Sequence, residues 1–145
     1  MNSPEGFRND AFAKVTGRAR YADDIVLPKM LHAVPVYTEY VHAEIRVIDT
    51  EEAAAMPGVV RVLTWEDVPG SLCFGQIEKD MPIFSSGKIR SYGDVIALVV
   101  AESRAEALSA AERVKFGGME LPGVFDPEEV LQEDAPLLFE ERKTN

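Results

Sequence analysis

Two stretches in the first third of the chain each predict a β-strand. Residues 30–37 (MLHAVPVY) are mostly apolar, and residues 41–48 (VHAEIRVI) alternate apolar and polar residues with the period of two that places alternate side chains on one face of a strand. Pro35 has no N–H to donate to a sheet, so the first strand is expected at an edge or at a bulge. The buried face of the second strand is expected to carry Val41, Ala43, Ile45 and Val47.

The following residues predict a short helix and a third strand. Asp49 and Glu52 have the spacing of a capping box, and Pro57-Gly58 ends the helix. Residues 59–64 (VVRVLT) are apolar and β-branched, which is typical of a strand. The pattern therefore predicts a strand–helix–strand unit.

One helical turn and a long loop are predicted next. In TWEDVPG, the Thr64 side chain can accept a backbone hydrogen bond, and Asp67 suits the positive end of the turn. Residues 71–87 contain several turn-forming residues and no sustained period. We expect Phe74 and Phe84 to hold this loop on the core.

The second half of the chain predicts another strand–helix–strand unit. Residues 95–101 (VIALVVA) form a nearly continuous apolar run, which is typical of a strand buried on both faces. Ser103 and Glu106 have capping-box spacing and begin a helix, and a short strand is expected around residues 115–116. The inner face of the helix is expected to carry Ala107, Leu108, Ala111 and Val114.

The N-terminal 29 residues are expected to form an extended arm. Gly6, Gly17 and Pro28 punctuate this segment, and no helical or strand period is sustained. A polar arm must pair its backbone groups on its own domain or on a neighbour. The stretch Lys14–Ala33 lacks the spacing of a ligand-binding loop, so we expect it to run over a protein surface.

The C-terminal residues are acidic, with no Lys or Arg from Glu120 to Glu141. Asp126 and Pro127 suit the N-cap and the first position of a helix. The segment contains prolines at 122, 127 and 136, and these fit both an ordered edge and a linker toward another domain.

Together these elements predict an α+β fold with a mixed sheet, two strand–helix–strand units and an extended N-terminal arm. We expect three parts: an arm (1–29), a core (30–119) and an acidic C-terminal segment (120–145). The last part is expected to pack on the core or to lead to an absent domain.

Composition narrows the classes of function. The 145 residues are enough for one domain, and the formal net charge of −10 disfavours nucleic acid and anionic membranes as partners. Cys73 is the only cysteine, so this chain alone forms no internal disulfide and holds no iron–sulfur cluster. With a polar N-terminus and no apolar run long enough to span a bilayer, these features lead us to expect a soluble, cytoplasmic protein.

Templates for phosphate binding and nucleophilic catalysis do not match. Gly87-Lys88 is followed by Ile89, and Pro82 stands where a phosphate-binding loop has its first glycine. Gly117-Gly118 opens no helix and is better explained by a turn or bulge. No serine lies in a GxSxG motif, so a small independent hydrolase has no support.

The histidines and paired aspartates have structural explanations. His32 and His42 lie in predicted strands without the spacing of a metal site, and we expect both to be partly buried and hydrogen-bonded. Asp23-Asp24 could bind a divalent cation, but adjacent carboxylates in a turn more often cap amides or pair with arginines such as Arg18 and Arg20. Tyr92-Gly93-Asp94 is expected to form a turn before the buried strand.

The order of several motifs resembles a known family. They are KVTGRARYADD, MLHA, HAEIRVIDTEEAAAMPGVVRVLTWEDVPG, a loop containing FG and DMPIF, KIRSYGDVIALVVAES and ELPGVFDPEE. This series resembles the α/β-hammerhead domain that begins the large, molybdopterin-binding subunit of the xanthine dehydrogenase and aldehyde oxidase family. The resemblance runs from about Arg8 to Leu138, and the order of the motifs is more specific than any one of them.

The resemblance implies a structural domain of an oxidoreductase that hydroxylates aldehydes or N-heterocycles. It implies molybdenum-molybdopterin, [2Fe–2S] clusters and FAD in the whole enzyme, and none of these in this chain. The implied partners are the molybdopterin-binding domain and the iron–sulfur domain or subunit. The family's catalytic and cofactor-binding residues lie in later domains, so no catalytic, cofactor-binding or metal residue is assigned here. The structural role rests on Lys14–Asp24, Gly58, Gly93 and Leu121-Pro122.

One segment departs from the family pattern. In VKFGGMELP, Gly118 stands where the family usually has tyrosine, and Met119 stands where an acid is common. Paired glycines are expected to loosen the last strand and to remove an aromatic contact. The alternative function is therefore a free-standing protein-binding module that kept the fold without the enzyme. An adjacent reading frame for the molybdopterin domain would favour the enzyme, and an isolated gene would favour the module.

Overall fold

The computed structural model describes residues 8–140, and the chain divides into two compact units, Met1–Met30 and Leu31–Asn145. The first unit contains a short helix, α1 (Ala11–Val15), and a 3₁₀ turn, η1 (Ala22–Asp24). The sequence pattern did not indicate these helical turns. Within residues 8–140, no helix is long and apolar enough to cross a lipid bilayer.

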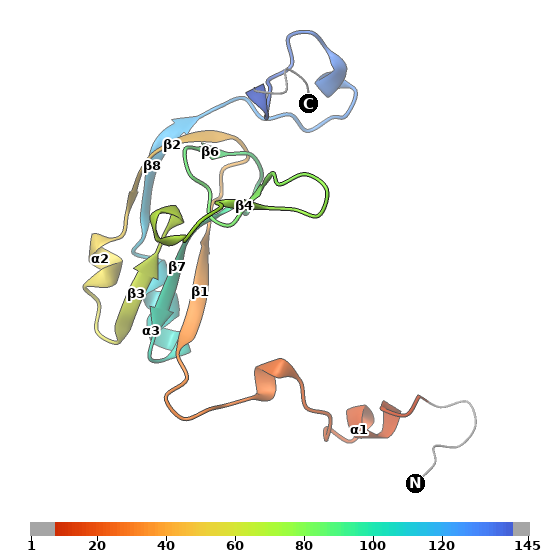
Figure 1. Cartoon of the computed structure of the whole chain (residues 1–145), viewed down its shortest axis with the longest axis vertical. Coiled ribbons are helices and arrows are strands. Elements are labelled where there is room, and N and C mark those ends of the chain that lie inside the picture. The colour runs from red at the N-terminus through yellow and green to blue at the C-terminus, as the bar shows by residue number, and fades with distance from the viewer. Residues whose placement is uncertain (1–7, 141–145) are drawn as a thin grey trace. The chain divides into compact units, whose positions relative to one another are not determined.

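Eight strands of the second unit form three small sheets (Figure 1). The first sheet has the order β1-β7-β3, the second β6-β2-β8, and the third is the hairpin β4-β5. The bounds are β1 His32–Tyr37, β2 Ala43–Asp49, β3 Val59–Leu63, β4 Cys73–Phe74, β5 Met81–Pro82, β6 Lys88–Ile89, β7 Val95–Ala101 and β8 Lys115–Glu120. Every strand pair among these elements is antiparallel.

The α+β class and both strand–helix–strand units are confirmed, but the strands do not form one mixed sheet. Helix α2 (Glu51–Ala54) connects β2 to β3, and helix α3 (Arg104–Ala111) connects β7 to β8. In each strand–helix–strand unit the two strands belong to different sheets. The connection from β2 to β3, residues 50–58, is shorter than the crossover of about a dozen residues that parallel neighbours need.

Pro35 lies on an edge strand, as the sequence predicted. Strand β1 pairs with β7 on one side, and the register shifts between Val36 and Tyr37. An edge position tolerates the missing N–H of proline because the strand's outer side needs no ladder partner.

The expected burial of alternate residues in β2 holds only up to a bulge. Ala43 is fully buried, and Ile45 is half-buried. The register with β8 then shifts between Ile45 and Val47, so Val47 becomes exposed and Ile48 takes the half-buried position. Placing Val47 on the buried face was wrong because one extra residue in a bulged strand reverses the faces of those that follow.

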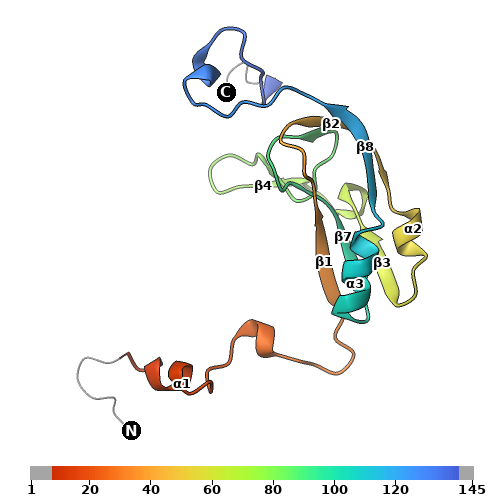
Figure 2. The same cartoon turned by 180° about the vertical axis from the view of Figure 1, so that it is seen from behind.

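The main core lies between the two helices and the β1-β7-β3 sheet. Ala53 of α2, Val99 of β7 and Ala110 of α3 are fully buried at its centre. Partly buried residues packed around them are Val36, Met56, Val59, Val62, Ala111 and Val114. Figure 2 shows α3 lying across the strands β1 and β7, where small alanines permit a close approach.

One residue that was expected on the inner face of α3 is exposed. Ala107 and Ala110 are fully buried, whereas Leu108 is 46% exposed. The stripe that faces the sheet contains positions 107, 110, 111 and 114, which follow the helical repeat of 3.6 residues. Leu108 lies one residue, and therefore about 100°, away from Ala107 around the helix axis.

The predicted caps at Ser103 and Thr64 form. The Ser103 hydroxyl accepts from the Glu106 N–H at 3.2 Å and donates to the Glu106 carboxylate at 2.7 Å. Thr64 accepts from the Glu66 N–H, and Asp67 accepts from the Thr64 N–H at 3.0 Å.

The expected Asp49–Glu52 capping box is wrong. Helix α2 has Thr50 as its N-cap residue, and the Asp49 carboxylate instead accepts from the Glu51 N–H at 3.0 Å. Glu52 points to other partners, because its carboxylate lies 2.7 Å from the Lys115 ammonium and 3.3 Å from the Arg113 guanidinium. The hydrogen bond from Lys115 is the main reason that the pKa of Glu52 lies below its ordinary value of 4.5.

Replacing Glu52 with glutamine is expected to weaken the pH dependence of stability. A carboxylate with a lowered folded pKa stabilises the fold above its unfolded value, about 4.5 here, and loses this contribution as the pH falls through the folded value. Glu52→Gln should therefore reduce the difference between the free energies of unfolding at pH 7 and pH 3. Urea denaturation followed by circular dichroism measures both, with the exposed neighbour Glu51→Gln as the control. Equal pH dependence in the two variants would contradict this role.

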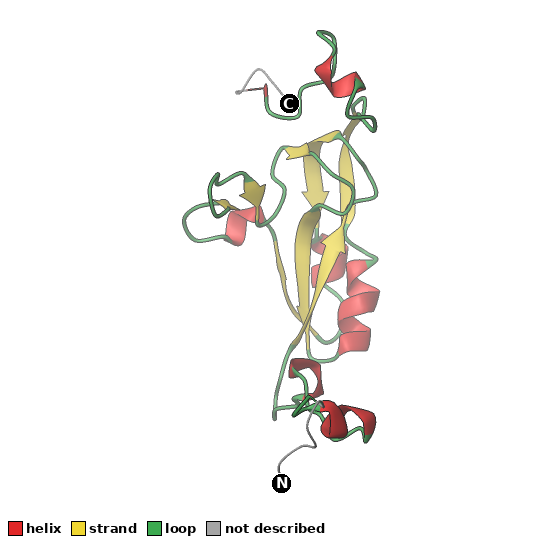
Figure 3. Cartoon of the chain, turned by 90° about the vertical axis from the view of Figure 1, so that its right-hand side faces the viewer, coloured by secondary structure: helices red, strands yellow, loops and turns green. Residues whose placement is uncertain are grey.

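The loop 71–87 contains the β4-β5 hairpin, and only one of its phenylalanines reaches the core. Phe84 is buried, whereas Phe74 is exposed, so the expectation that both hold the loop on the core was wrong for Phe74. Phe74 lies opposite Met81 in the hairpin, so the Phe74 side chain belongs to the hairpin and not to the core. Figure 3 shows the hairpin on the side of the sheets opposite α3.

Strand β8 is longer than expected, and its paired glycines do not interrupt it. It pairs with β2 from Lys115 to Glu120. A Cβ atom at Gly118 would collide with the Glu44 carbonyl oxygen and lie 2.7 Å from the Phe116 ring. The Phe116 ring therefore covers Gly118, and it also packs against Tyr40 with ring centroids 5.2 Å apart. An aromatic contact is thus present within the strand, and the expected loosening stays a prediction.

Candidate functional site

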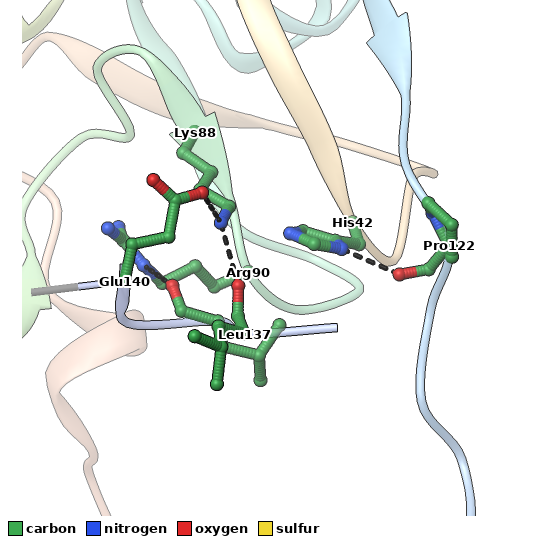
Figure 4. Close-up of polar contacts among 7 residues, drawn as sticks. His42, Lys88, Arg90, Pro122, Leu137 and Glu140 are labelled. Atoms are coloured by element: carbon green, nitrogen blue, oxygen red, sulfur yellow. Dashed lines mark hydrogen bonds and ion pairs between the residues drawn. The ribbon is translucent and has the colours of Figure 1, made fainter. Parts of the chain in front are cut away.

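The histidine at the start of β2 is a structural anchor. His42 is only 4% exposed, and its Nδ1 atom lies 2.7 Å from the Pro122 carbonyl oxygen (Figure 4). Because a carbonyl only accepts, the Nδ1–H must donate. The Leu121 N–H also donates to the His42 carbonyl at 2.9 Å, so two hydrogen bonds hold the chain where it leaves β8. The expectation of a buried, hydrogen-bonded histidine is confirmed for His42.

The second ring nitrogen of His42 is buried. Within residues 8–140 it has no hydrogen-bond partner. Figure 4 shows it on the side of the ring away from Pro122. His32 lies in β1 and is half-buried. In the part of the chain that the structure describes, no three His, Cys, Asp or Glu side chains gather as a metal site.

One of the paired aspartates of the first unit caps a turn. The Asp24 carboxylate accepts from the Tyr21 N–H at 2.9 Å, which confirms the capping expectation. The expected pairing with arginines is not seen: among residues 8–140, no ion pair joins Asp23 or Asp24 to Arg18 or Arg20. Arg18 instead lies over the Phe12 ring, 5.9 Å from its centroid.

Two cations, one in β6 and one just after it, hold the end of the acidic C-terminal segment (Figure 4). The Lys88 ammonium donates to the Leu137 carbonyl at 2.9 Å and lies 3.1 Å from the Glu140 carboxylate. The Arg90 Nε–H donates to the Leu138 carbonyl at 2.9 Å. The Arg90 guanidinium also stacks over the Phe139 ring, 4.9 Å from its centroid. We call these two cations and residues 137–140 the tail clip.

Local structure places the two cations on one side. Ile89 between them is fully buried, and alternate residues of an extended strand point to opposite faces. The Asp94 carboxylate accepts from the Arg90 N–H at 2.9 Å and from the Ser91 hydroxyl at 2.6 Å. Gly93 has a φ of +85°, which suits glycine, so the expected turn before β7 is confirmed.

Between these two anchors the C-terminal segment has little regular structure. The Asp126 carboxylate accepts from the Glu128 N–H at 2.7 Å, but the N-cap residue of the turn that follows is Glu128, so the expected N-cap role of Asp126 was wrong. The expected helix is a single 3₁₀ turn, η3 (Glu129–Leu131). A helix would have needed a longer run of favourable residues than the six between Pro127 and Asp134.

Exposed large apolar side chains occur along much of the described chain, and two segments carry several each. In the arm they are Phe12, Val15, Tyr21, Ile25, Val26 and Leu27. In and next to the hairpin they are Phe74, Ile77, Met81 and Ile83, and Ile77 is 95% exposed. Cross-strand pairing puts Phe74 opposite Met81, so these two lie on the same face of the ribbon. An isolated two-stranded hairpin is marginally stable in water, so an apolar face of this kind favours a protein partner.

A hollow beside the second sheet is lined in part by polar and charged side chains. A cavity of about 570 Å³ lies along β2 and β8. Its polar side chains are those of Asp49, Thr50, Glu51 and Lys115.

Sequence reasoning missed Lys88 and Arg90 as functional candidates. Lys88 was considered only as part of a phosphate-binding motif. Their partners lie 48 to 52 residues further along the chain, and no local motif reports such a distance. The sequence does contain one indication of this contact. Lys88 and Arg90 are cations on either side of an isoleucine, and the C-terminal segment is rich in acidic and apolar residues.

Comparison with known proteins identifies relatives of this architecture. The sequence model "Aldehyde oxidase and xanthine dehydrogenase, a/b hammerhead domain" matches residues 16–122. The molybdenum-binding subunit of the xanthine dehydrogenase from Escherichia coli O157:H7 is 36% identical over 148 aligned residues, which cover 88% of this chain and 18% of that protein.

Two solved structures have the same fold. The aldehyde oxidoreductase from Desulfovibrio gigas superposes with a TM-score of 0.84 at 38% identity, over 90% of this chain and 16% of that one. The reconstituted CO dehydrogenase from Oligotropha carboxidovorans superposes with a TM-score of 0.86 at 33% identity, over 93% of this chain and 17% of that one. The chain thus spans less than a fifth of the length of these three relatives.

Proposed function

Because this chain belongs to the a/b hammerhead domain family of aldehyde oxidases and xanthine dehydrogenases, we propose that it is the structural N-terminal domain of a molybdenum hydroxylase large subunit. The observation that carries the proposal is the alignment of nearly the whole chain to a small part of much longer relatives. The domain contributes no catalytic residue, and the reaction belongs to other domains of the same enzyme.

The proposed enzyme is an oxidoreductase that acts on an aldehyde or an N-heterocycle. Molybdenum-molybdopterin is bound by the rest of the large subunit, and [2Fe–2S] clusters and FAD are carried by further domains or subunits. The chain by itself is inactive. The single cysteine, Cys73, supports a cytoplasmic location because disulfides have no role in this domain.

We assign the docking roles to the segments that carry exposed apolar side chains. The arm, residues 1–29, docks on the molybdopterin-binding domain or the iron–sulfur domain. The loop 71–87 docks in the same way through its hairpin. The core, residues 30–119, sets the distance between these contacts, and the acidic segment, 120–145, leads toward the next domain. Exposed apolar patches of this kind commonly mark interaction sites in soluble proteins.

Deleting residues 8–24 is expected to impair association with the remaining domains of the enzyme more than it impairs folding. The deleted residues belong to the first unit, so the core of the second unit keeps its contacts. Phe12, Val15 and Tyr21 are exposed in this chain and would become buried on docking. Burial of three apolar side chains contributes several kcal/mol, so their loss should weaken binding by at least about tenfold. Calorimetric titration of the purified cofactor-binding domains with each variant measures the affinity.

A substitution control separates specific docking from general loss of apolar surface. Val60→Ser with Leu108→Ser removes exposed apolar side chains from the second unit and should leave the affinity unchanged. Thermal unfolding of each variant reports the stability of the core. Global unfolding of the truncated chain, or undiminished binding by it, would overturn the proposed role of the arm.

A further inference from the structure

The acidic C-terminal segment is held on the domain at two separated points. At its start, the Leu121 N–H and the Pro122 carbonyl bond to the backbone and side chain of His42. At its end, the carbonyls of Leu137 and Leu138 accept from Lys88 and Arg90. Figure 4 shows both points on the same part of the fold. The residues between them are therefore tied at both ends.

The contacts at the second point recognise main chain more than side-chain charge. Both cations donate to carbonyl oxygens, and the Arg90 guanidinium lies over the Phe139 ring. The ion pair from Lys88 is to the Glu140 carboxylate, whose side chain is 77% exposed, so this pair contributes little. An extended segment with an aromatic side chain is the ligand that this arrangement suits.

Both cations start from residues that the core holds. Ile89 between them is fully buried, and the Arg90 backbone N–H donates to the Asp94 carboxylate at 2.9 Å. With the segment in place the Lys88 side chain is only 16% exposed. An ammonium so little exposed requires polar partners, and the Leu137 carbonyl supplies one.

We propose that Lys88 and Arg90 form a receptor for the extended segment 137–140, and that this receptor turns residues 121–140 into a rigid strut. The prolines at 122, 127 and 136 add to the stiffness because each fixes one backbone dihedral. The use of the strut rests on the proposed function: in the complete large subunit it sets the direction in which the chain leaves this domain toward the cofactor-bearing part.

Backbone order parameters from ¹⁵N relaxation of the 145-residue chain test the receptor. In the native chain, residues 137–139 are expected to have order parameters of about 0.85, typical of rigid backbone. In the double variant Lys88→Met with Arg90→Met, these values should fall below about 0.6, typical of flexible backbone, while those of β7 stay unchanged.

A charge-matched control and a second measurement complete the test. Lys79→Met with Arg104→Met removes two exposed cations and should leave the order parameters of the segment unchanged. Flexible residues 137–139 in the native chain, or equal rigidity in both double variants, would overturn the receptor. These outcomes do not depend on the enzyme, so they are distinct from a failure of the proposed function.

The role of the strut is tested in the complete large subunit. Small-angle X-ray scattering of the Lys88→Met, Arg90→Met variant should show a larger radius of gyration than the native subunit. An unchanged radius, with a segment already shown to be released, would overturn the orienting role while leaving the receptor in place.

Discussion

Replacing Gly118 with alanine is expected to lower the free energy of unfolding by about 3 kcal/mol, because the new methyl group would overlap a backbone atom. The Cβ atom would collide with the Glu44 carbonyl oxygen of the neighbouring strand and press on the Phe116 ring. A backbone carbonyl in a sheet cannot move aside without breaking the pairing of β2 with β8. Urea denaturation followed by circular dichroism measures the change.

The neighbouring glycine provides a matched control. A Cβ atom at Gly117 would lie 2.6 Å from the Val47 Cγ1 atom, which belongs to an exposed side chain. That side chain can rotate, so Gly117→Ala should cost about 1 kcal/mol or less. Both residues lie in the same strand, so the same change in β-propensity applies to each substitution. Equal losses of stability at the two positions would show that backbone overlap at Gly118 is not the cause.

Replacing Ile89 with alanine is expected to lower the free energy of unfolding by about 3 to 4 kcal/mol. Ile89 is among the largest fully buried side chains, and its removal leaves a cavity beneath β6. The loss should also reach the tail clip, because Ile89 fixes the strand that presents Lys88 and Arg90. Order parameters of residues 137–139 should therefore fall in this variant, even under conditions where the chain remains folded.

An exposed isoleucine is the control for this substitution. Ile77 at the hairpin is 95% exposed, so Ile77→Ala should change the free energy of unfolding by about 0.5 kcal/mol or less. Chemical denaturation at one temperature compares the two variants with the native chain. A loss at Ile89 as small as that at Ile77 would mean that β6 is not anchored by this side chain.

Much of the fold could be predicted from the sequence because the deciding interactions are local. The Ser103–Glu106 cap joins residues three apart in the sequence. The continuous apolar run of β7 by itself indicates a buried strand. Pro35 similarly indicates an edge strand by lacking an N–H. The family resemblance was also correct, since the order of motifs along the chain is itself sequence information.

The errors share a physical origin in packing between distant segments. The bulge after Ile45 reversed the exposure of Val47, and the period of two alone carries no sign of a bulge. Glu52 pairs with Lys115 and does not form the expected cap. Lys115 follows α3 in the sequence and comes close to Glu52 only through the packing of α3 on the sheet. Leu108 was assigned to the buried face because it is apolar, whereas small alanines occupy that face.

The candidate site was the least predictable part. His42 was expected to be buried and hydrogen-bonded, but its partner, Pro122, lies 80 residues away. The receptor residues Lys88 and Arg90 meet their carbonyl partners only when β6, the turn at Asp94 and the C-terminal segment are all in place. Main-chain carbonyls exist at every residue, so the sequence carries no mark of which ones are bound.

By itself the sequence determined the strands β1, β2, β3 and β7, the helices α2 and α3, several of the caps and turns, and the family to which the chain belongs. Each of these depends on side chains within a few positions of one another. The tertiary structure alone decided that the strands divide among separate sheets, that Phe116 covers Gly118, and that two cations hold the end of the chain. Those features depend on contacts between segments far apart in the sequence, which form only when the chain packs around its core.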